Sequence, residues 1–115
     1  MNKVKNIVDK TINYYNTACP FEICKMMNIK VMYQELTPNV KGFFVKIFNK
    51  LTIIINIDLN EDERKSVCAH ELGHIIMHDG TNSVQMINND DSTVVKLEEE
   101  ADNFAMYLLE ELSRV

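Results

Sequence analysis

The sequence predicts a small α+β fold: a short antiparallel sheet of about three strands packed against helices, in one domain of residues 1–115. Apolar residues recur at helical spacing near both ends of the chain, which indicates amphipathic helices there. The middle of the chain instead holds short segments rich in Val, Ile, Phe and Tyr, which favour strands. With 115 residues and 46% hydrophobic content, the chain can bury a single ordinary core.

Two scaffold helices are expected at the start of the chain. The first follows from apolar side chains at helical spacing: Val4, Ile7, Val8, Ile12 and Tyr15. Pro20 can begin a second helix that runs to about Met27, because proline is favoured at the first helical position.

Three strands are expected next, at residues 31–35, 42–48 and 51–57. Asn49 and Lys50 mark the turn of a hairpin between the second and third strands. The third strand then leads directly into the next helix.

That helix is expected at residues 61–78, in the centre of the domain. Asn60 and Glu63 form a plausible capping box at its start. Residues 67–77 are apolar nearly all round, which is typical of a buried helix. Gly73 costs about 0.5–1 kcal/mol relative to alanine inside a helix, so a close backbone approach is expected there.

The last helix is expected at residues 94–112, after a polar surface connection at residues 81–92. Its apolar residues recur at helical spacing and form one stripe: Leu97, Ala101, Phe104, Ala105, Leu108, Leu109 and Leu112. This stripe predicts which face of the helix packs on the core.

Chemistry is indicated by an H-E-x-x-H motif, the run His70, Glu71, Leu72, Gly73 and His74. Residues four apart lie one turn above each other, so the two histidines can hold one divalent cation. Zinc suits imidazole ligands, and three protein ligands plus water are typical of a catalytic site. The alternative is a helix with one packed and one solvated histidine, in which Glu71 is an ordinary surface charge.

A third ligand is expected from the acidic run Glu98, Glu99 and Glu100, with Asp102 behind it. Helical geometry places Glu98 within the apolar stripe, whereas Glu99 and Glu100 project outside it. A carboxylate directed into a core is costly unless it is paired or binds a metal, so Glu98 is the expected ligand. Asp102, one turn further, could accept the free ring N–H of His70. The alternative is that Glu98 and Asp102 merely flank the core stripe near the positive end of the helix dipole.

The remaining histidine, His78, is not expected to bind the metal. On a continuous helix it lies about 12 Å along the axis from His70, too far to share an ion whose Zn–N bonds are about 2 Å. His78 is expected instead to cap the C-terminus of the helix, before a stop at Asp79 and Gly80.

Charge and cysteine content narrow the class of protein. The formal net charge is −5 without a basic stripe, which argues against direct binding to nucleic acid. No apolar segment has the length of a signal peptide core or a membrane span, so no membrane partner is expected. Cys19, Cys24 and Cys68 form no paired framework, which favours a reducing cytoplasm and cysteines that pack as small apolar side chains.

The run HELGH at residues 70–74 and the segment EEEADNFAMYLL at residues 98–109 resemble the ImmA/IrrE family of zinc metallopeptidases. Members typically show HELGH and a later E-x-E-A-N/D-x-F-A-x-x-L-L segment. The resemblance covers most of the chain and implies a zincin-like fold with H-E-x-x-H on a central buried helix. It implies that the metal ligands are His70, His74 and Glu98. It also implies that Glu71 is the catalytic glutamate and that Asp102 holds a ligand histidine in place.

Two departures from the family pattern limit what is carried over. Family members often continue from Leu-Leu into Met-Pro, and many carry an added helix-turn-helix or sensory domain, whereas Glu110 and Glu111 follow here before the chain ends. We therefore expect control by expression, by a partner or by metal supply. The substrate implied by the resemblance is a helix-turn-helix repressor of a phage, a mobile element or a stress regulon.

The predicted function is a zinc-dependent endopeptidase that acts as a site-specific regulatory protease. Glu71 would take a proton from the zinc-activated water and pass it to the leaving amine. An exposed sheet edge, for which residues 51–57 are the candidate, would align the substrate as an added strand.

Two alternatives remain open at this point. The first is a zinc-stabilised binding module that inactivates its repressor by contact alone, without proteolysis. The second is a purely structural zinc site, which would need a fourth ligand; Cys68, the nearest contender, points away from the metal-binding face. No oxyanion donor is identified, because packing or capping is the favoured role of Tyr33, Tyr107 and His78.

Overall fold

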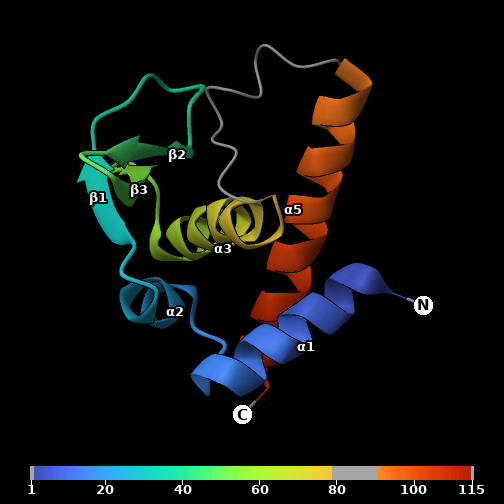
Figure 1. The fold of residues 1–115 in the computed structure, drawn as a ribbon. Helices are drawn as coiled ribbons and strands as arrows, with labels where there is room; N and C mark the ends of the chain where they lie inside the picture. The colour runs from blue at the N-terminus through green and yellow to red at the C-terminus, as the bar shows by residue number, and fades with distance from the viewer. Residues whose placement is uncertain (1, 79–90, 115) are drawn as a thin grey trace.

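The computed structural model of the chain describes residues 2–78 and 91–114. The elements of this part follow in the order α1 (Lys3–Tyr15), α2 (Pro20–Met26), β1 (Lys30–Gln34), β2 (Gly42–Ile47), β3 (Lys50–Asn56), α3 (Glu61–Met77) and α5 (Asp91–Ser113). Helices and a three-stranded sheet form separate parts of the molecule, so the predicted α+β class is confirmed (Figure 1). Most of the expected connection at residues 81–92, and the expected helix stop at Asp79 and Gly80, lie outside the described residues; residues 91 and 92 begin α5.

The sheet has the strand order β1-β3-β2, with β3 in the centre. β2 and β3 are antiparallel and are joined by a two-residue turn at Phe48 and Asn49, where φ is 48° and 67°. The turn lies one residue earlier than expected, because Lys50 already pairs with Ile47 as the first residue of β3. Positive φ at both turn positions suits the right-handed twist of a hairpin. β1 pairs with the other side of β3 in parallel, with Val31 opposite Ile53.

This sheet corrects two expectations. It is mixed rather than antiparallel, and β3, the strand expected to offer an exposed edge, lies between two others. The cause is the burial of β3, whose residues 52–56 are all buried: the most apolar strand loses most contact with water at the centre of a sheet. The hairpin places β2 on one side of β3. Because β1 runs opposite to β2, its pairing with the remaining side of β3 is parallel.

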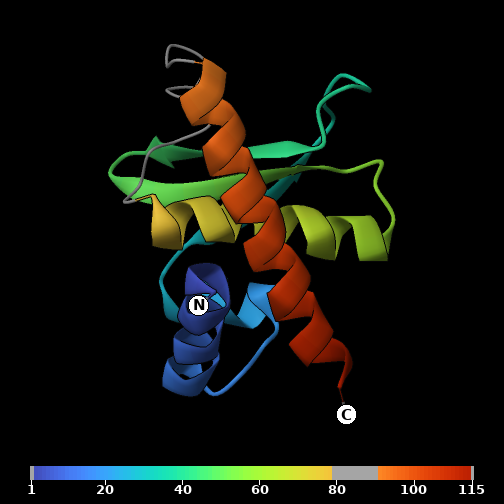
Figure 2. The ribbon, with the colours of Figure 1, turned by 90° about the vertical axis from the view of Figure 1, so that its right-hand side faces the viewer.

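α3 is the central helix, in contact with α2, α5, β2 and β3. Figure 2 shows α5 crossing it. At its start Asn60 Oδ1 accepts a hydrogen bond from the Glu63 N–H at 2.8 Å, and Glu63 Oε1 accepts one from the Asn60 N–H at 3.1 Å. Residues 67–69 and 71–75 are buried. The predicted capping box and the predicted buried central helix are both confirmed.

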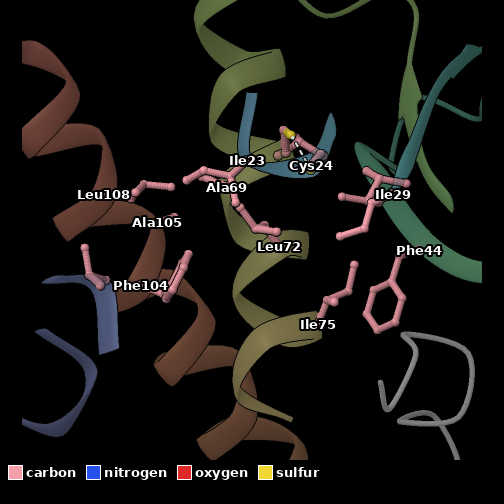
Figure 3. Packing of buried hydrophobic residues seen from close by; sticks show 14 of the residues in the cluster. Ile23, Cys24, Ile29, Phe44, Ala69, Leu72, Ile75, Phe104, Ala105 and Leu108 are labelled. Carbon is pink, nitrogen blue, oxygen red and sulfur yellow. Dashed lines mark hydrogen bonds between the residues drawn. The ribbon is translucent and has the colours of Figure 1, made fainter. Parts of the chain in front are cut away.

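The core surrounds α3. Leu72 and Ile75 of α3 lie between Phe104 and Leu108 of α5 on one side and Phe44 of β2 on the other, and all five are buried (Figure 3). This packing fixes the position of α5 and the sheet relative to the motif helix.

The three cysteines are free, as expected. Cys24 and Cys68 are buried with their Sγ atoms 3.7 Å apart, while Cys19 is partly exposed. Among the described helices, none combines the length and the apolar character needed to cross a bilayer.

Candidate metal centre

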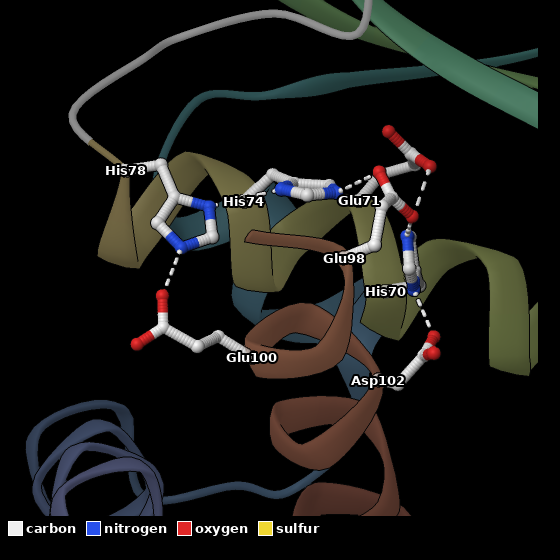
Figure 4. Close-up of polar contacts among 7 residues, drawn as sticks. All are labelled: His70, Glu71, His74, His78, Glu98, Glu100 and Asp102. Carbon is white, nitrogen blue, oxygen red and sulfur yellow. Dashed lines mark hydrogen bonds and ion pairs between the residues drawn. The ribbon is translucent and has the colours of Figure 1, made fainter. Parts of the chain in front are cut away.

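Two histidines of α3 and a glutamate of α5 converge on one point (Figure 4). His70 Nε2 lies 2.9 Å from Glu98 Oε2, and His74 Nε2 lies 3.0 Å from Glu98 Oε1. One ligand atom from each of the three residues lies within 4.8 Å of the other two. Two imidazole nitrogens and a carboxylate oxygen form a donor set that zinc accepts. The residues therefore fit a Zn²⁺ ion.

The crossing of α3 and α5 brings these three side chains together. His70 and His74 share one face of α3 because they are one turn apart. Between them, a Cβ added to Gly73 would lie only 3.1 Å from Phe104 of α5, so the close approach expected at this glycine is confirmed. Glu98 precedes Phe104 by six residues on α5, which carries its carboxylate across the histidine face.

Asp102 contacts the ring of His70 from the side away from Glu98. Its Oδ1 atom lies 2.8 Å from His70 Nδ1, while the Asp102 side chain is otherwise largely exposed. An ionised carboxylate can only accept a hydrogen bond, so the His70 proton is assigned to Nδ1. A metal at the cluster would take the lone pair of His70 Nε2, the nitrogen that faces Glu98.

His74 has a different outer partner, one that the sequence interpretation missed. Its Nδ1 atom lies 2.9 Å from His78 Nδ1, and His78 Nε2 lies 3.0 Å from Glu100 Oε1 (Figure 4). His78 does end α3, as expected, because its N–H donates to the His74 carbonyl at 2.9 Å. Its side chain contacts Glu100 of α5 as well as His74. Two spacings in the sequence could have indicated these contacts: His78 follows His74 by four residues, and Glu100 follows Glu98 by two.

Burial controls the protonation of His74, whose side chain is fully buried. Burial lowers the pKa of His74 to about 4, the nearby charge of His70 acts in the same direction, and the Glu98 carboxylate opposes both. His74 is therefore neutral at pH 7, the form in which an imidazole can bind a metal.

A cavity of about 610 Å³ opens beside the cluster. Glu71 lines it, with its Oε2 atom 4.0 Å from His70 Nε2 and its side chain 8% exposed. Lys41, which precedes β2, Gly42, its first residue, and Met106 of α5 also line the cavity. The cavity therefore joins the histidine cluster to an edge strand of the sheet.

Other residues considered from the sequence lie away from the cavity. Tyr33 stacks under the Arg64 guanidinium, whose Cζ is 4.7 Å from the ring centroid. The Tyr107 hydroxyl accepts a hydrogen bond from the Asn2 side chain. Cys68 lies against a second buried cysteine rather than joining the ligand cluster. Packing contacts therefore account for all three side chains.

Comparisons with known proteins give one family match and two similar proteins. The family model for the IrrE N-terminal-like domain, Peptidase_M78, matches residues 24–109. The chain is 37% identical to "Uncharacterized immunity region protein 2" of Bacillus phage phi105, over 92% of this chain and 67% of that protein. It is 28% identical to "Metallopeptidase ImmA" of Bacillus subtilis strain 168, over 92% of this chain and 62% of that protein. The chain thus spans about two thirds of the length of these relatives. No solved structure gave a significant match.

Proposed function

The chain belongs to the Peptidase_M78 family with IrrE N-terminal-like domains, and we propose that it is a zinc-dependent endopeptidase whose metal ligands are His70, His74 and Glu98. The observation that carries the proposal is the approach of both histidine Nε2 atoms to the two oxygens of Glu98, at 2.9 and 3.0 Å. These are hydrogen-bond distances, and the same two nitrogens and the same carboxylate would coordinate a Zn²⁺ ion placed among them. Three protein ligands leave a coordination position for water, which is the arrangement of a catalytic zinc site.

Glu71 is the proposed general base. When bound, Zn²⁺ would lower the pKa of water toward about 7 and polarise the scissile carbonyl. The Glu71 carboxylate lines the cavity beside His70, within reach of a water at the ligand cluster. It would take the proton of the attacking water and then give this proton to the leaving amine.

The substrate strand is proposed to pair with β2. This strand lies at an edge of the sheet and has no second strand partner among the described residues. Its first residue, Gly42, lines the cavity that holds Glu71. An extended peptide that adds to this edge would satisfy main-chain hydrogen bonds and pass the ligand cluster. The β2 edge therefore replaces the buried β3 edge in the proposal.

The proposed substrate is a helix-turn-helix transcriptional repressor in the cytoplasm. Its support is the resemblance of the HELGH and EEEADNFAMYLL segments to ImmA/IrrE peptidases. The similarity to a phage protein named for an immunity region points in the same direction.

The test is incubation of the purified protein with the helix-turn-helix protein encoded nearest its gene, with and without a zinc chelator. We expect cleavage only when zinc is present. Glu71→Gln should retain zinc and slow cleavage by about 10²–10⁴-fold, because it removes proton transfer and not a ligand. Glu99→Gln is the matched control, since Glu99 is an exposed neighbour of Glu98, and should cleave normally.

Two outcomes would count against the proposal. An intact partner at saturating zinc would contradict proteolysis of that partner. If Glu71→Gln released the repressor from DNA as well as the unaltered protein does, the zinc-stabilised binding module would be favoured instead.

A further inference from the structure

The ring of His78 has both of its nitrogens engaged. Nδ1 lies 2.9 Å from His74 Nδ1, and Nε2 lies 3.0 Å from Glu100 Oε1 (Figure 4). The His78 side chain is only 7% exposed. We propose that Glu100 and His78 form a positioning relay, in which a carboxylate acts through an intervening imidazole to fix the tautomer and orientation of His74. This inference rests on the proposed metal site.

The proton positions in this relay follow from Glu100. An ionised carboxylate only accepts hydrogen bonds, so His78 Nε2 must carry a proton and donate it to Glu100. When Nε2 of His74 holds a metal, the proton of that ring is on Nδ1, so His74 donates and the facing Nδ1 of His78 accepts. His74 is thereby left with its lone pair on Nε2, the atom that faces Glu98.

The opposite assignment fails at Glu100. If His78 carried its proton on Nδ1 and donated to His74, its bare Nε2 would face the Glu100 carboxylate at 3.0 Å. Two acceptors at that distance repel each other, and the buried ring has little access to water that could relieve the repulsion. Glu100 therefore selects the tautomer of His74 without touching it.

The two ligand histidines are thus supported in different ways. His70 donates directly to Asp102, which is the usual pairing of a metal-bound histidine with a carboxylate. His74 reaches its carboxylate only through His78. Asp102 and Glu100 come from the same helix as Glu98. α5 therefore supplies one proposed ligand and the two carboxylates that orient His70 and His74.

Zinc affinity tests the relay without relying on cleavage. We expect Glu100→Gln to weaken zinc binding, measured by competition with a chromogenic chelator, by about 10–100-fold, the usual effect of losing an outer partner of a ligand. Glu99→Gln changes the same functional group on the adjacent, exposed residue and should leave the affinity unchanged. His78→Asn keeps an acceptor for His74 but does not reach Glu100, so its affinity should fall between those of the unaltered protein and His78→Ala.

Nitrogen NMR of histidine-labelled protein gives a second measurement, because it reports the tautomer of each histidine and not the overall stability of the fold. In the zinc-loaded protein we expect the proton of His74 on Nδ1 and that of His78 on Nε2. In Glu100→Gln we expect His78 to populate both neutral tautomers.

The relay would be overturned if Glu100→Gln bound zinc as tightly as Glu99→Gln, or if His78 carried its proton on Nδ1. Failure of the unaltered protein to bind zinc would instead overturn the metal site itself. Zinc binding by the unaltered protein therefore distinguishes a failure of the relay from a failure of the proposed metal site.

Discussion

Gly73 of α3 faces Phe104 of α5 so closely that a Cβ on residue 73 would lie 3.1 Å from the Cβ, Cγ and Cδ1 atoms of the Phe104 side chain. This contact sets the distance between the two helices at the level of the proposed ligands. His74 of α3 and Glu98 of α5 meet on the same side of this crossing. The absence of a side chain at residue 73 therefore favours both the core packing and the close approach of the two helices beside the site.

Gly73→Ala is expected to lower the free energy of unfolding by about 1 kcal/mol. Alanine gains about 0.5–1 kcal/mol of helix propensity, but overpacking a core typically costs about 1–3 kcal/mol. The atoms that would be met include Phe104 Cβ, which cannot move without the α5 backbone. Urea denaturation would measure the change. If the contact is the cause, the loss should shrink in part in a Phe104→Ala background, which removes Cγ and Cδ1 but keeps Cβ; an equal loss in both backgrounds would contradict this explanation.

Gly42→Ala is expected to be more destabilising than Gly73→Ala, by up to about 3 kcal/mol. A Cβ at residue 42 would lie 2.6 Å from Val67 Cγ1 and 2.7 Å from the Ile54 carbonyl oxygen. The Ile54 oxygen belongs to the backbone of the central strand and cannot withdraw. Val67→Ala should therefore restore only part of the stability lost in Gly42→Ala. Full recovery would show that the backbone contact is unimportant.

Phe48→Asn is expected to stabilise the protein by about 0.5–1 kcal/mol and to raise Tm by several degrees. Phe48 has φ of 48° in the hairpin turn and is fully exposed, so it contributes no burial and adopts a conformation that asparagine tolerates better. Differential scanning calorimetry would measure Tm. Phe48→Leu is the control, because leucine is equally unsuited to positive φ; the same gain from both variants would contradict the conformational argument.

Thiol reactivity should separate Cys19 from the other two cysteines. A hydrogen bond to Cys24 and burial both raise the pKa of the Cys68 thiol, which suppresses the reactive thiolate. Cys24 is also fully buried, whereas Cys19 is partly exposed. In the native protein iodoacetamide should alkylate Cys19 first, and in urea it should alkylate all three cysteines. Mass spectrometry of Cys19→Ser should show almost no native labelling; rapid labelling of Cys68 would contradict the packing.

Features recorded by local periodicity could be predicted from the sequence. The capping box at Asn60 and the buried motif helix depend on residues within a few turns of one another. Glu98 could be chosen because its position relative to the apolar stripe is set within its own helix. The parallel pairing of β1 depends instead on which strand occupies the centre of the sheet. That position is set by packing in the folded protein and cannot be read from the sequence of one strand.

The relay residues illustrate the same limit within the site. Helical projection placed Glu100 outside the apolar stripe, and the structure agrees that its side chain is only partly buried. Its partner was not predicted because His78 was expected only to cap α3, and no spacing within one helix places a residue of α5 beside it. Only the crossing of α5 over the end of α3 brings the two residues together.

The metal-free protein should lose stability as the pH falls below the ordinary histidine value. The pKa of His74 is about 4 in the folded chain and 6.5 for an unperturbed histidine, so between these values the unfolded chain binds the extra proton. The contribution of His74 to stability is therefore complete above about pH 6.5 and is lost progressively toward pH 4. Because carboxylates also titrate in the lower part of this range, the measurement is the difference in unfolding free energy between the unaltered protein and His74→Gln at each pH. That difference should rise with pH and then level off; a flat difference across the window would show that burial does not hold His74 neutral.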